Sequence, residues 1–68
     1  MEGNWVKVHV VSMEYEAAIV KGLLEENDID CVIVNKKDSS YLLGDIEVFV
    51  EVENALLAKQ IITKLQGE

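Results

Sequence analysis

The spacing of apolar positions along the chain predicts three strands. Residues 5–11 and 46–52 alternate between apolar and other side chains, which is the period of a strand with one buried face. Residues 30–35 contain an unbroken apolar run, which indicates a strand covered at least partly on both faces. In the first strand this alternation puts Val6, Val8 and Val10 on the buried face and Trp5, Lys7 and His9 on the other. In the third strand it puts Glu47, Phe49 and Glu51 opposite Ile46, Val48, Val50 and Val52.

Two other segments carry apolar residues at helical spacing. Residues 13–26 place Ala17, Val20 and Leu24 on one stripe, with Ser12 as the expected N-cap. Asn27-Asp28 is expected to end this helix, because either residue accepts the left-handed conformation found after a helix end. A second helix is predicted over about 55–66, with Asn54 as its N-cap. Its apolar stripe is Leu57, Ala58, Ile61, Ile62 and Leu65.

The element order β-α-β-β-α predicts one α+β domain over residues 1–68. This is a ferredoxin-like sandwich that stops before its fourth strand. A β-α-β crossover is right-handed, so we expect both helices on the same face of a three-stranded sheet. We expect the second and third strands to form an antiparallel hairpin. The first and third strands are expected to be adjacent and parallel.

The charge balance disfavours several partner classes. The 68 residues hold thirteen acidic side chains and six basic ones, for a net charge of −7. All six basic residues are lysine, and an acidic surface repels the phosphates of nucleic acid. The single Cys31 lies in an apolar run, and no signal peptide or spanning segment is evident. We therefore expect a cytoplasmic protein that contacts neither nucleic acid nor membrane.

Catalytic and metal-binding patterns are weak. His9 is the only imidazole, so a Cys/His or Ser/His nucleophile system would have to use it. The sequence has no CxxC, HxH or HExxH spacing for a metal and no glycine-rich phosphate loop. Most carboxylates fall at outward positions, as on a solvated acidic surface. We expect no enzyme activity, no metal and no cofactor.

The uncovered face of the sheet is the expected contact surface. Its candidate interface residues are Trp5, Lys7, His9 and Phe49, and the first strand is left as an edge. Exposed aromatic residues on a small domain favour a partner, so we expect a homo-oligomer formed through this face, the edge or both. A possible protein partner is a further expectation. The alternative is a monomer in which Lys7 pairs with Glu47 or Glu51.

The segment 38–45 has two interpretations. Asp38, Ser39, Ser40 and Tyr41, followed by Gly44, could bind a small polar ligand. Alternatively, residues 38–40 form a self-bonded turn, and Gly44 takes a positive φ on entering the third strand.

The sequence resembles a family of small bacterial proteins of unknown function, catalogued as "putative prokaryotic signal-transducing proteins". The resemblance covers nearly the whole chain. It rests on Trp5-Val6-Lys7-Val8, Tyr15-Glu16-Ala17, Gly22-Leu23-Leu24-Glu25-Glu26-Asn27, and Asp38-Ser39-Ser40-Tyr41 leading to Gly44.

The family is similar in fold to PII-like, ferredoxin-like regulators. It implies a regulatory or binding module and brings no catalytic residues to carry over. Asn27-Asp28 stands where such sequences often have Asn-Gly. PII-like nucleotide sites commonly rely on basic groups, and this chain has no arginine to carry over to such a site.

The function expected from the sequence is a small non-catalytic regulatory, signal-transducing or interaction module. It would act through oligomerisation and protein contacts. The alternative is a sensor that binds a small polar ligand at the 38–45 loop, in a cleft between protomers.

Overall fold

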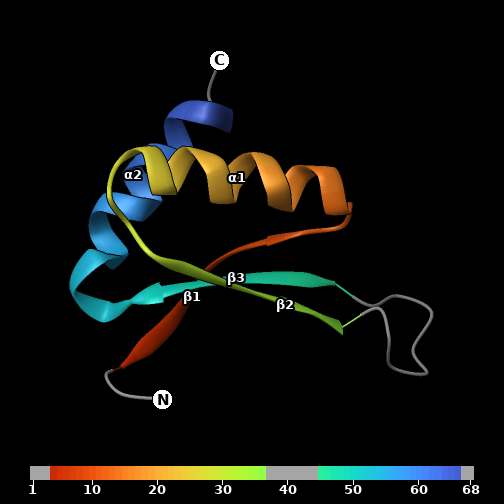
Figure 1. Ribbon diagram of the computed structural model, residues 1–68, viewed down its shortest axis with the longest axis horizontal. Coiled ribbons are helices and arrows are strands. Elements are labelled where there is room, and N and C mark those ends of the chain that lie inside the picture. Colours follow the sequence, from red (N-terminus) through yellow and green to blue (C-terminus); the bar gives the residue numbers. More distant parts are fainter. Residues whose placement is uncertain (1–3, 37–44, 67–68) are drawn as a thin grey trace.

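Two layers make up the molecule (Figure 1). The computed structural model describes residues 4–36 and 45–66. One layer is a sheet of β1 (Trp5–Val11), β2 (Cys31–Asn35) and β3 (Ile46–Glu51). The other consists of α1 (Glu14–Glu26) and α2 (Ala55–Gln66), which lie on the same side of the sheet. The short 3-10 turn η2 (Val52–Asn54) joins β3 to α2. The predicted order β-α-β-β-α and the α+β sandwich are confirmed.

Strand β3 lies at the centre of the sheet. The strand order is β1-β3-β2, and β3 pairs with both neighbours in antiparallel fashion. The first and third strands are adjacent, as expected, but the expected parallel pairing is wrong. The α1 crossover leaves β1 and β2 pointing the same way. The hairpin then reverses β3 and inserts it between them, so it opposes both.

A β-bulge interrupts β1 at Val8. Lys7 is opposite Phe49 and His9 is opposite Val48, so Val8 is the extra residue. Beyond the bulge the alternation changes sense: Val11 is buried and Val10 is 41% exposed. The prediction that Val10 faces the core and His9 faces away is therefore wrong. One inserted residue shifts every later side chain to the opposite face, and the alternation in the sequence does not reveal it.

The core lies between the helices and the sheet. Its largest fully buried side chains are Leu24, Ile29, Ile46, Val48 and Val50. Strand β3 supplies three of them, and α1 buries Ala17, Val20 and Leu24 as its stripe predicted. Helix α2 buries a narrower stripe than expected, because Ala58 and Ile62 are buried while Leu57 and Leu65 remain 48% and 43% exposed.

Helix α1 begins one residue later than predicted, at Glu14, and its N-cap moves by one residue as well. The N-cap is Met13 rather than Ser12, because Met13 is the last residue with extended backbone angles. Methionine has no side-chain oxygen with which to cap the helix. Instead, Glu16 Oε1 accepts a hydrogen bond from the Met13 backbone N–H at 3.2 Å, and the Glu16 N–H donates to the Met13 carbonyl oxygen at 3.1 Å. Helix α2 begins at Ala55, as predicted, but Asn54 is not its N-cap. Asn54 belongs to the 3-10 turn that runs directly into α2, and the last residue with extended backbone angles is Glu51.

The C-terminus of α1 closes in a Schellman motif. The Ile29 N–H donates to the Leu24 carbonyl oxygen, and the Asp28 N–H donates to that of Glu25, both at 3.0 Å. Asp28 has a φ of 62°, which confirms the left-handed residue expected at this helix end. Ile29, only 2% exposed, then packs in the same core cluster as Leu24.

We predict that Asp28→Gly stabilises the protein by up to about 1 kcal/mol, because glycine adopts a positive φ without the steric penalty of a Cβ atom. Asp28→Ala is the matched control, and its melting temperature is expected to fall. Thermal unfolding followed by circular dichroism measures both variants. A lower melting temperature for Asp28→Gly would contradict this account of the helix end.

Candidate functional site: the open face of the sheet

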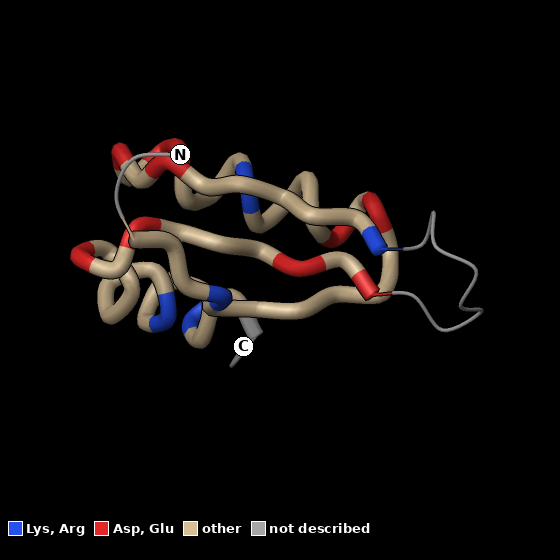
Figure 2. Tube along the Cα trace, turned by 90° about the horizontal axis from the view of Figure 1, so that it is seen from below, with Lys and Arg blue, Asp and Glu red and all other residues tan. Residues whose placement is uncertain are grey.

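The described helices leave one face of the sheet uncovered, and we call it the open face (Figure 2). Strand alternation and register place eight side chains on it. These are Trp5, Lys7, Val10, Val32, Val34, Glu47, Phe49 and Glu51. Acidic side chains lie along the central strand β3, while the edge strands contribute apolar residues and Lys7. Along its middle the face therefore has two glutamates with Phe49 between them, and its flanks are apolar or basic.

An apolar hollow occupies part of the open face. It has a volume of about 230 Å³ and is lined by Trp5, Val32, Val34 and Phe49. These residues come from all three strands, so the hollow exists only because β3 lies between β1 and β2. Trp5 and Phe49 are partly exposed, and Val34 is 36% exposed. Such a hollow suits an aliphatic or aromatic side chain from a partner.

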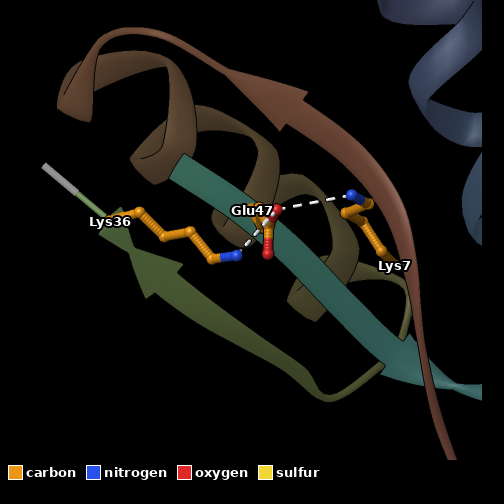
Figure 3. A network of polar contacts seen from close by, with 3 residues as sticks. All are labelled: Lys7, Lys36 and Glu47. Atoms are coloured by element: carbon orange, nitrogen blue, oxygen red, sulfur yellow. Dashed lines mark hydrogen bonds and ion pairs between the residues drawn. The ribbon is translucent and has the colours of Figure 1, made fainter. Parts of the chain in front are cut away.

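Glu47, Lys7 and Lys36 form a charged cluster at one end of the open face (Figure 3). Glu47 Oε2 lies 3.3 Å from Lys7 Nζ and 3.5 Å from Lys36 Nζ. The Glu47 side chain is only 13% exposed, whereas the two lysines are about half exposed. One carboxylate shared by two ammonium groups leaves a net charge of +1 in the cluster. Lys7 pairs with Glu47, as the monomeric alternative expected. The pairing leaves the apolar hollow uncovered.

Glu51 lies at the other end of the open face. It is directly opposite Trp5 in the register, so the two side chains are cross-strand neighbours on this face. Within residues 4–36 and 45–66, no ion pair to Glu51 forms. Along β3, the open face thus has the charged cluster around Glu47 at one end, Phe49 in the wall of the hollow at the middle, and the Glu51 carboxylate at the other end.

The structure places three of the four predicted interface residues together. Trp5, Lys7 and Phe49 lie on the open face, as predicted, but His9 does not. The bulge turns His9 to the helix side, where it lines a groove of about 260 Å³ with Val11, Tyr15, Glu16, Ile19, Val20 and Leu65. Sequence reasoning missed Lys36, although it continues the alternation of Val32 and Val34 at a spacing of two residues.

The predicted ligand-binding residues Asp38, Ser39, Ser40, Tyr41 and Gly44 lie outside the described residues. The described ends of this segment are joined, because the Lys36 N–H donates to the Asp45 carbonyl oxygen at 2.9 Å. The sensor function at 38–45 therefore stays a prediction.

Cys31 and His9 do not meet. They lie on the two edge strands with β3 between them, which separates the strands by about 10 Å. Burial raises the pKa of the Cys31 thiol above its ordinary value, and this disfavours the reactive thiolate. Among the described residues, no three His, Cys, Asp or Glu side chains are grouped to hold a metal ion. None of the described helices is both long and apolar enough to span a membrane.

The raised pKa predicts a pH dependence of stability. Above the ordinary thiol value of 9.0, the unfolded chain releases the Cys31 proton while the folded chain retains it. The contribution of Cys31 to the unfolding free energy is thus full below that pH and falls as pH rises toward the folded pKa.

Urea unfolding gives the unfolding free energy of the wild type and of Cys31→Ala at pH values between 8 and 10. The effect of Cys31 is the difference between the two proteins in how steeply this free energy changes with pH. We expect stability to fall more steeply with pH in the wild type. Equal slopes would contradict the account.

Comparison with known proteins gives one match. A family model described as "putative prokaryotic signal transducing protein" matches residues 5–66. No curated protein and no solved structure matches the chain significantly.

Proposed function

The chain belongs to the family described as "putative prokaryotic signal transducing protein", and we propose that it is a non-catalytic regulatory module that works through protein contacts. The contact surface is the open face, and the first partner is a second copy of the chain. We place this activity in the cytoplasm, where a lone buried thiol such as that of Cys31 stays reduced.

The observation that carries the proposal is the apolar hollow on the open face. Trp5 and Phe49 are two of the four aromatic residues in the chain, which has one Trp, two Tyr and one Phe. Both line the hollow and are partly exposed instead of packing in the core. Aromatic side chains contribute much of the free energy of protein association, and covering them removes apolar surface from water.

The open face is favoured over the β1 edge of the sheet as the contact surface. The bulge at Val8 interrupts the β1 ladder, and bulges and lysines are common devices that prevent an edge strand from pairing with another chain. Lys7 lies next to this bulge. A strand from another chain could therefore form regular backbone hydrogen bonds with only part of β1.

We predict that the wild type self-associates at high micromolar concentration and that Phe49→Ser weakens this association more than about tenfold, because the hollow loses its aromatic wall. Ile19→Ser is the matched control, because Ile19 is 52% exposed on α1, away from the open face. Sedimentation equilibrium measures the mass of each protein, and circular dichroism checks that each variant is folded.

Two results would overturn the proposal. One is a wild type that stays monomeric at high micromolar concentration. The other is an equal loss of association in Ile19→Ser and Phe49→Ser.

A further inference from the structure

The outer face of α2 differs from the rest of this acidic chain in combining lysines with an exposed leucine. Leu56 is 72% exposed, the largest exposed fraction among the large apolar residues described. Helix α2 contains Lys59 and Lys64 but no acidic residue, whereas α1 contains Glu14, Glu16, Glu25 and Glu26. Helix α2 is thus a cationic element with an apolar side chain projecting from it.

The order of charges along the 3-10 turn η2 and helix α2 complements the order along the open face. Glu53, Leu56 and Lys59 are all exposed and follow one another at intervals of three residues, about one helical turn each. Along β3 the open face presents Glu47 with its two lysine partners, then Phe49 in the wall of the hollow, then Glu51. With Leu56 in the hollow, Glu53 of the preceding 3-10 turn lies toward the cationic cluster and Lys59 of α2 lies toward Glu51.

The dimensions agree as well. Successive side chains on the open face of β3 are about 7 Å apart, and three helical residues rise about 4.5 Å. The long side chain of Lys59 spans the remaining distance to Glu51. Helix α2 has 12 residues and is about 18 Å long, while β3 has six residues and is about 20 Å long. The helix therefore fits along the strand.

From this match we infer that the open face of one copy is covered by the outer face of α2 of a second copy, with Leu56 in the hollow and Lys59 paired with Glu51. The inference rests on the proposed function and names the other half of the same contact. The cation of Lys59 also lies near the Trp5 indole, where a cation–π interaction adds to the ion pair.

The contact is necessarily head-to-tail. Helix α2 and the open face lie on opposite sides of the sheet (Figure 1), so two copies cannot exchange both contacts within one pair. Each added copy presents a new open face or a new helix, and the assembly grows into a ring or a filament. Each contact involves only one short helix and a three-stranded sheet, so we expect it to be small, weak and reversible.

A mixing experiment separates this arrangement from a symmetric one. Phe49→Ser damages the open face but retains α2, whereas Leu56→Asp damages α2 but retains the open face. We expect each variant alone to lose association more than about tenfold in sedimentation equilibrium. An equimolar mixture is expected to form a heterodimer that grows no further, because only one intact contact can form.

Failure of the inference and failure of the proposed function give different results. If Leu56→Asp associates like the wild type while Phe49→Ser does not, the open face is a contact surface but α2 does not cover it. If the wild type is monomeric, both fail. Since Leu56 is 72% exposed, its substitution leaves the core intact, and an unchanged melting temperature confirms this.

A charge exchange tests the ion pair itself. Glu51→Lys changes the net charge from −7 to −5, so general repulsion between copies falls and would strengthen association. Loss of the Lys59–Glu51 pair instead predicts association about threefold weaker. The double variant Glu51→Lys/Lys59→Glu restores the net charge of −7 and the pair, and is expected to recover wild-type association. Stronger association in Glu51→Lys, or no recovery in the double variant, would overturn the pairing.

Discussion

The insertion of β3 between β1 and β2 determines both surfaces of the sheet. On one face, Ile46, Val48 and Val50 are almost completely buried under the helices. On the other, Glu47, Phe49 and Glu51 form the middle of the open face. Because side chains alternate along a strand, the register that buries the first set necessarily presents the second. The core and the candidate site are therefore two consequences of the same pairing.

The open face is a large part of the sheet surface, because the two described helices cover only one side. A chain of 68 residues buries only about 60% of its unfolded surface, and two helices cover only one side of the sheet. The uncovered side is not simply polar. It contains an apolar hollow and a carboxylate held by two lysines. In the contact that we propose, the hollow favours association, while the charges select which surface of a partner can approach.

Much of the fold was predictable, because alternation and helical spacing are local signals. The strand over residues 5–11, the buried stripe Ala17, Val20 and Leu24, and the left-handed Asp28 all follow from their neighbours in the sequence. The direction of β3 relative to β1 was not predictable from local signals, because it depends on how the β2–β3 hairpin places β3 in the sheet. The position of His9 depends on the β-bulge at Val8, and a sequence in which every second residue is valine gives no sign of an inserted residue. Met13 replaced Ser12 as N-cap because the Glu16 carboxylate could cap the helix from within its first turn.

Trp5 provides the most direct test of the account, because it is the only tryptophan in the chain and lines the hollow. The measurement is its fluorescence emission and its quenching by iodide, followed from low micromolar to millimolar protein concentration alongside the sedimentation mass. The account predicts that emission shifts to shorter wavelength and quenching decreases as the mass rises, because a second copy covers the indole. A mass that rises while the emission and quenching of Trp5 stay constant would contradict it.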